Sequence, residues 1–103
     1  MMRAMLDPEL EDRIEALVKV GRHADAADLS AAHGDAARAG ELYAAVWSWD
    51  DAIAITEQNG LYDRAYRHAL EAKDRAATGR LLIALEEHPE LAARAAAHAE
   101  DRG

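Results

Sequence analysis

Metal binding is the first chemistry that the side chains of this sequence suggest, because the chain contains five histidines. They are His23, His33, His68, His88 and His98. A zinc site on one helix pairs two histidines four residues apart, so that both reach the same face. No pair here has that spacing, and His68 stands three residues before Glu71, which is common by chance. We therefore expect turn or surface histidines, and no metal ion or other cofactor.

Catalysis would require reactive side chains that face one another. The adjacent acids are Glu11-Asp12, Asp50-Asp51 and Glu86-Glu87. Neighbouring residues of a helix point in different directions, so these pairs are not catalytic dyads; the Asp50-Asp51 pair suits the first turn of a helix. The chain has no cysteine. Neither Ser30 nor Ser48 lies in the strand–turn–helix setting of a catalytic serine, and we expect no enzymatic activity.

The aromatic side chains give a better indication of function. All five lie within 24 positions, and they are Tyr43, Trp47, Trp49, Tyr62 and Tyr66. Trp and Tyr are enriched at binding hot spots, so these five are the candidate protein-binding residues. For Trp49 and Tyr62 we favour the alternative that they fill gaps left by alanine inside the fold. Trp47 stands where sister turns have glycine; a contact surface and a packing role both stay open, and the first predicts that Trp47→Ala weakens partner binding more than folding.

These residues belong to a chain with a thirteen-residue period. One register holds Gly21, Gly34, Trp47, Gly60 and Lys73. The position five residues later holds Ala26, Ala39, Ala52, Ala65 and Thr78. A fixed period is typical of an array built from one supersecondary unit. Helices of about eleven residues are marginal alone in water, so neighbours must stabilise them, and short turns make consecutive helices antiparallel.

Helix signals divide the sequence into about seven segments, and none has the alternation of a strand. The expected N-caps are Asp7, Asp35, Ser48 and Asp74, with Ser48 and Asp51 a weak capping-box match. Pro8 and Pro89 suit the first position of a helix. The first segment ends before Gly21, the second runs from about Ala24 to His33, and the last ends near Ala99.

Apolar side chains define the faces that these helices should bury. The expected faces include Leu6, Leu10, Ile14, Leu17 and Val18 in the first helix, Ala39, Leu42, Tyr43 and Val46 in the third, Ala65, Tyr66, Ala69 and Leu70 in the fifth, and Ala77, Leu81, Leu82 and Leu85 in the sixth. Gly40 and Gly79 occupy the same slot of the period. A glycine inside a helix costs about 1 kcal/mol relative to alanine, so we expect close approach of helix backbones at both.

Composition limits the possible partners. The chain has 103 residues and a net charge of −8, which predicts one domain and disfavours nucleic acid and anionic membranes. Alternatively, the charge only keeps an alanine-rich protein soluble. The longest apolar run, 81–85, is too short to span a membrane, and Met1–Leu6 is not a convincing signal peptide. We expect a cytoplasmic protein, and the Ala/Arg bias favours a bacterial source.

The turn sequences 34–39, 47–52 and 60–65 resemble the inter-helix turn of tetratricopeptide repeats. That family places Gly at a helix end and Ala five residues on, often with an aromatic residue between, which Trp49 and Tyr62 match. Its period is about 34 residues, with the motif on alternate helices, whereas here the motif recurs on every helix. The resemblance, over residues 21–85, is therefore to the broader tetratricopeptide-like group that includes coat-protein and clathrin-type α-solenoids. It implies protein binding and scaffolding, without a recognisable carboxylate clamp.

The sequence thus predicts an all-α fold, a right-handed α-α superhelix of about seven short antiparallel helices. It forms a single domain, 1–103. Residues 1–20 are expected to form an N-terminal capping helix, residues 21–85 the thirteen-residue units and residues 86–103 a C-terminal capping helix. The predicted function is a non-catalytic adaptor or scaffold that binds a protein or peptide. The alternative is a structural subunit that forms homo-oligomers through its terminal helices.

Overall fold

The computed structural model describes residues 8–102, with side chains as far as Ala96. Within this range the chain is helical throughout and has no strand, which confirms the predicted all-α class. In chain order the helices are α1 (Pro8–Lys19), α2 (His23–Ala32), α3 (Ala36–Ala45), α4 (Trp49–Gln58), α5 (Tyr62–Ala72), α6 (Arg75–Glu86) and α7 (Pro89–Arg102). The last helix continues past its predicted end near Ala99. The predicted positions of Leu6 and Asp7, and the side chain of His98, lie outside the described residues.

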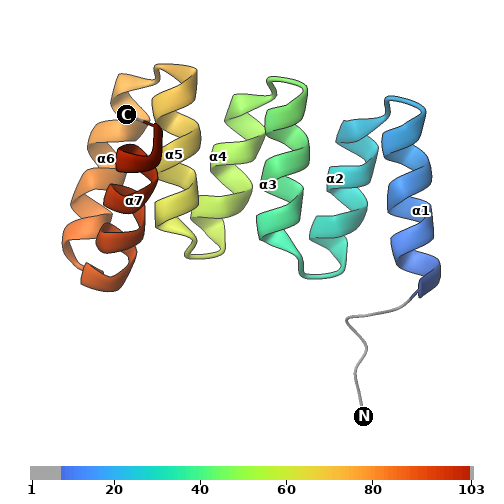
Figure 1. Ribbon diagram of the computed structural model, residues 1–103, viewed down its shortest axis with the longest axis horizontal. Helices are drawn as coiled ribbons and strands as arrows, with labels where there is room; N and C mark the ends of the chain where they lie inside the picture. Colours follow the sequence, from blue (N-terminus) through green and yellow to red (C-terminus); the bar gives the residue numbers. More distant parts are fainter. Residues whose placement is uncertain (1–7, 103) are drawn as a thin grey trace, which may run out of the picture.

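The helices stand side by side in chain order, and consecutive helices run in opposite directions (Figure 1). Each helix packs against the next, and α7 folds back so that it also contacts α5. The connecting turns therefore alternate between two edges of the row. The α1–α2, α3–α4 and α5–α6 turns share the upper edge in Figure 1.

The residue that opens each thirteen-residue unit adopts the same left-handed backbone conformation. Its φ is +83° at Gly21, +86° at Gly34, +62° at Trp47, +75° at Gly60 and +60° at Lys73. In each turn this residue donates its N–H to the carbonyl three residues earlier, and the next residue donates to the carbonyl five residues earlier. These are Schellman caps, which end a helix and reverse the chain. The period in the sequence is therefore the spacing of one repeated turn.

The alanine five residues into each unit lies where helices cross. Ala26, Ala39, Ala52 and Ala65 are completely buried, whereas Thr78, in the fifth unit, is half-buried. A small side chain at this position lets adjacent helices approach closely. Toward the C-terminal half, the buried residues Ile53, Ala65, Ala69, Ala77 and Leu81 form a core cluster.

The predicted N-caps Asp35, Ser48 and Asp74 each precede a helix, but only the two aspartates cap it with their side chains. The carboxylates of Asp35 and Asp74 each accept a hydrogen bond, at 3.1 Å, from the backbone N–H three residues later. Ser48 is the N-cap of α4, but its hydroxyl makes no bond to the backbone and donates instead to the Asp51 carboxylate, at 3.0 Å. The capping box predicted there is wrong.

The two helical glycines turn out to differ. Gly40 is buried, and a Cβ at this position would lie 2.7 Å from the Thr56 Cγ2 and 3.3 Å from the His68 Nε2. The expected close approach therefore holds at Gly40 chiefly toward these two side chains, since the nearest backbone atom, the Ala52 carbonyl oxygen, would lie 3.7 Å from the Cβ. The expectation is wrong at Gly79, where a Cβ would meet nothing within 4 Å.

Three residues assigned to apolar faces are exposed instead. Val46 lies open at the end of α3, and Leu70 and Leu82 are each 46% exposed. A helix buries only the strips of its surface that face neighbouring helices. Helix α6 carries adjacent apolar residues at 81–83, and a helix cannot turn three consecutive side chains toward one neighbour. Leu81 is buried, while Leu82 and Ile83 point outward.

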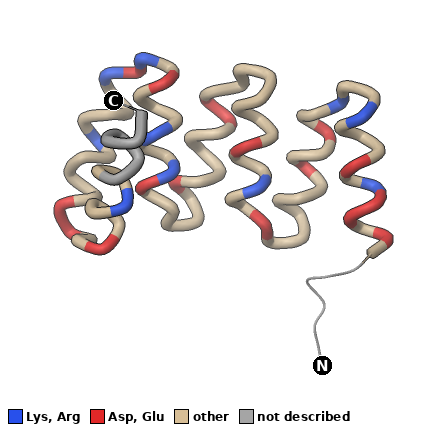
Figure 2. Tube along the Cα trace, viewed as in Figure 1, with Lys and Arg blue, Asp and Glu red and all other residues tan. Residues whose placement is uncertain are grey.

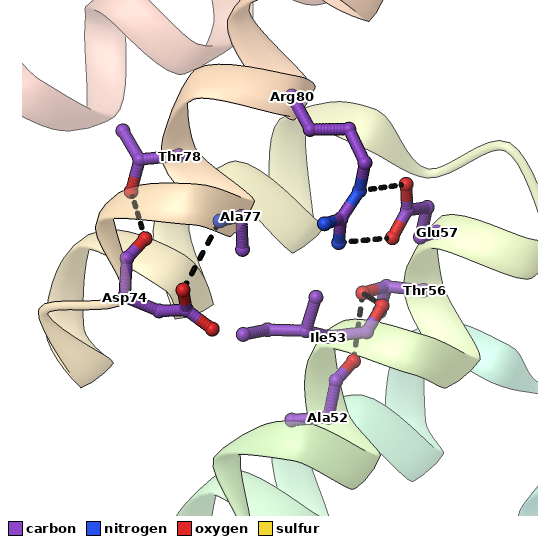
Figure 3. Close-up of polar contacts among 8 residues, drawn as sticks. All are labelled: Ala52, Ile53, Thr56, Glu57, Asp74, Ala77, Thr78 and Arg80. Atoms are coloured by element: carbon purple, nitrogen blue, oxygen red, sulfur yellow. Dashed lines mark hydrogen bonds and ion pairs between the residues drawn. The ribbon is translucent and has the colours of Figure 1, made fainter.

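Ion pairs join helices that are two apart in the row. Arg38 of α3 pairs with Glu11 of α1 at 2.5 Å, and Arg67 of α5 pairs with Glu41 of α3. Arg80 of α6 makes two hydrogen bonds to Glu57 of α4, at 2.9 and 2.8 Å (Figure 3), which lowers the pKa of the Glu57 carboxyl. Exposed pairs of this kind contribute about 0–1 kcal/mol each, so they align the helices more than they stabilise them.

Candidate binding surface

The five predicted aromatic residues do not form one cluster. Tyr43 on α3 is half-buried, and its hydroxyl donates a hydrogen bond to the Asp28 carboxylate on α2. That bond, with the nearby negative charge, raises the pKa of Tyr43 to about 12. Tyr43 therefore joins two neighbouring helices.

Trp49 begins α4 and is half-buried, with its ring centroid 6.2 Å from that of His68. His68 on α5 is fully buried, and neither of its ring nitrogens has a hydrogen-bond partner among the described residues. Burial lowers the pKa of the imidazole, so the neutral form is favoured. The expectation of turn or surface histidines is wrong for His68, because its ring packs against Gly40, where the absence of a side chain leaves room for it.

Tyr62 and Tyr66 are the two aromatic residues that the fold brings together. Both are half-buried on α5 and pack against the core cluster around Leu81. The Tyr62 ring also stacks on His88, with centroids 5.2 Å apart. The Tyr66 side chain also lines a groove between α5, α6 and α7, so part of it faces solvent.

Trp47 is the exception among the five, because its side chain is 79% exposed. It occupies the left-handed position of the α3–α4 turn, where the corresponding residues of three sister turns are glycines. Its backbone N–H donates to the Ala44 carbonyl at 2.9 Å, so the turn itself is regular. The ring is thus displayed at one edge of the row.

The groove between α5, α6 and α7 has a volume of about 270 Å³. Its lining is mostly apolar and consists of Tyr66, Leu70, Leu82, Leu85, Glu86, Ala92, Ala95 and Ala96. Only Tyr66 was a candidate binding residue from the sequence. The unbroken apolar run at 81–85 was the available signal, because a helix cannot turn every residue of such a run toward its neighbours.

A second hollow of about 480 Å³ continues from the first at the α5–α6 turn, and the two share Leu70 and Leu82. The remaining lining residues are Lys73, Arg75, Thr78 and Gly79. We call the two hollows together the α5–α6–α7 groove. Thr78 is held in place because its hydroxyl donates to the Asp74 carbonyl at 2.8 Å (Figure 3). The groove therefore has an apolar floor and one basic end.

Two other features, a metal site and a membrane-spanning helix, have no support among the described residues. Among the described side chains, no three His, Asp or Glu residues gather closely enough to hold a metal ion. The part of the chain that the structure describes also contains no helix of the length and apolarity needed to cross a membrane.

Comparisons of the chain with protein-family models, with curated proteins and with solved structures find no match. The groove and its surroundings are therefore the features of the molecule that point to a function.

Proposed function

We propose that this protein is a non-catalytic protein–protein interaction module, an adaptor or scaffold of the bacterial cytoplasm with a right-handed tetratricopeptide-like superhelix. The repeated left-handed turn, the buried alanine of each unit and the ion pairs between alternate helices support a repeating array. Arrays of this kind are stabilised by contacts between neighbouring units and present extended surfaces to partners.

The observation that carries the proposal is the α5–α6–α7 groove. Leu70 and Leu82 share its floor although each is nearly half exposed to water. Contiguous exposed apolar surface that has polar residues at its rim marks interaction sites. A protein or peptide segment that places apolar side chains in this groove would cover both leucines. The partner class follows from the acidic net charge of −8, which disfavours nucleic acid and anionic lipid.

The test uses two neighbouring residues of α6 that differ in one respect. Leu82 lines the groove, whereas Ile83 is 64% exposed and lies outside it. Leu82→Asp places a charge on the groove floor, and Ile83→Asp places the same charge beside it. We expect an affinity capture from the native extract to recover a protein with wild type and with Ile83→Asp, but not with Leu82→Asp.

Circular dichroism of both variants provides the control for folding, since both residues are surface positions where substitutions usually change stability by no more than about 0.5 kcal/mol. Recovery of the same proteins by Leu82→Asp as by wild type would contradict a role for the groove. Self-assembly is a second candidate function, and the exposed Trp47 turn argues for it more strongly than the terminal helices do.

A further inference from the structure

Trp47 and Lys73 are the two non-glycine residues with positive φ in the described chain. An L-residue in this conformation costs about 1–2 kcal/mol, and such strain gathers at functional sites. Trp47 carries a further cost, because its large apolar ring is open to water beside the exposed Val46. Lys73 lines the α5–α6–α7 groove. The two strained residues thus mark a protruding ring and a hollow.

The hollow at the basic end of the groove suits an aromatic ring. Its floor is formed by Leu70 and Leu82, and Gly79 leaves open space above α6, since a Cβ there meets nothing within 4 Å. Lys73 and Arg75 stand at the rim, where cations are attracted to the face of an indole. The Thr78 oxygen donates its own hydrogen to a backbone carbonyl and keeps lone pairs that can accept from an indole N–H.

Charges are complementary between the same two places. Asp50 and Asp51 are exposed in the first turn of α4, immediately after the Trp47 turn. Lys73 and Arg75 flank the α5–α6 turn in a chain whose net charge is −8 (Figure 2). Asp74, between them, uses its carboxylate to cap α6. A second copy of this chain therefore offers both a ring and acidic side chains that could meet the basic end of the groove, whose own lining has no acidic residue.

We propose that the Trp47 turn of one copy docks into the basic end of the α5–α6–α7 groove of a second copy, and that the contact is made twice. The α3–α4 and α5–α6 turns share one edge of the row (Figure 1), so a two-fold axis can bring each turn to the groove of the other copy. This inference rests on the proposed function of the groove as a protein-binding surface, and it adds a second copy of the chain as an occupant of the basic end.

The decisive variant is Trp47→Gly, because it removes the ring and installs the residue that three sister turns use. Relief of the left-handed strain offsets the entropy that a glycine adds to the unfolded chain, so folding is preserved. Loss of one hot spot raises a dissociation constant by about 30-fold or more, and this substitution removes the ring from both contacts of the dimer. In sedimentation equilibrium we expect wild type to dimerise and Trp47→Gly to be shifted at least that far toward monomer. The matched control is Val20→Ser, which removes an exposed apolar residue from the sister α1–α2 turn and should leave dimerisation unchanged.

The groove side is tested by Gly79→Gln, which fills the open space with a side chain that favours helix. We expect this variant to keep or raise the melting temperature and to weaken the dimer. Arg75→Glu should also weaken the dimer. The double variant Arg75→Glu with Asp50→Arg exchanges the two charges and should restore part of the lost dimer affinity.

A wild-type chain that is monomeric at the highest soluble concentration would overturn the proposal, as would a Trp47→Gly variant that dimerises like wild type. Both results are distinct from failure of the proposed function. That function concerns capture of a different protein, and it is lost with Leu82→Asp whether or not Trp47 is present.

Discussion

His68 makes stability depend on pH at the scale of a single residue. Its imidazole is buried near Gly40 and Trp49, and burial lowers its pKa below the ordinary value of about 6.5. The charges that act on it are Glu41 and Glu71, which favour its protonation, and Arg64 and Arg67, which oppose it. Well above the ordinary pKa neither folded nor unfolded chain is protonated there, and His68 contributes no pH dependence.

As the pH falls through that value, the unfolded chain binds a proton that the folded chain does not. The free energy of unfolding must therefore decrease as the solution becomes more acidic. We expect the melting temperature of wild type to fall more than that of His68→Met between about pH 7.5 and pH 5, the range in which histidine titrates. The other titratable groups are common to both proteins, so equal falls would show that His68 is not the cause.

At the scale of the helices, Gly40 and Gly79 occupy equivalent slots of the period but have different surroundings. Gly79→Ala adds a methyl group in open space and removes the helix penalty, so we expect stability to rise by about 1 kcal/mol. For a domain of this size that raises the melting temperature by about 4–8 °C. Gly40→Ala brings a methyl group to 2.7 Å from the Thr56 Cγ2, so we expect this substitution to lower the melting temperature.

Thr56→Ser provides the control for this contact, because it removes the methyl group and keeps the hydroxyl that donates to the Ala52 carbonyl. We expect Gly40→Ala to be tolerated better in the Thr56→Ser background, as measured by thermal unfolding. Independent effects of the two substitutions would mean that α3 and α4 adjust at this point without strain.

The helix positions could be predicted because each unit repeats one turn whose requirements are local. A left-handed residue ends a helix, a small residue follows five positions later, and Asp35 and Asp74 cap the next helix. The direction that each side chain faces could not be predicted as well, since it depends on which neighbours flank a helix. Leu82 follows Leu81 in sequence, and only the packing of α6 decides which of them is covered.

The groove escaped prediction for a related reason. It exists because α7 folds back onto α5 as well as α6, and this contact joins residues far apart in the thirteen-residue frame. The aromatic residues indicated hot spots by type alone, but type does not distinguish Tyr43, which joins two helices, from Trp47, which faces water. The strained backbone at Trp47 was the more specific signal, because glycine occupies the same slot in sister turns.

At the scale of the whole molecule, a row of helices need not be equally stable along its length. Helix α1 packs mainly against α2 and has Ile14 as its one buried residue among those described. Helix α5 packs against α4, α6 and α7 and contributes to the core cluster around Leu81. Stability in arrays of repeats is close to a sum of local and nearest-neighbour terms, so local unfolding should begin at α1.

Hydrogen exchange of backbone amides tests this gradient, and we expect exchange in α1 to be fastest and exchange in α5 to be slowest. Two substitutions of buried residues, each expected to cost about 2–5 kcal/mol, separate local from global opening. Ile14→Ala should accelerate exchange in α1 and α2 while α5 keeps its protection, because no core contact of α5 involves Ile14. Leu81→Ala should accelerate exchange from α4 to α7, since it removes a large side chain from the core cluster.

Uniform acceleration of exchange by Ile14→Ala would show instead that all the helices unfold as one cooperative unit. In that case the contacts of the small buried alanines couple neighbouring helices more strongly than their size suggests.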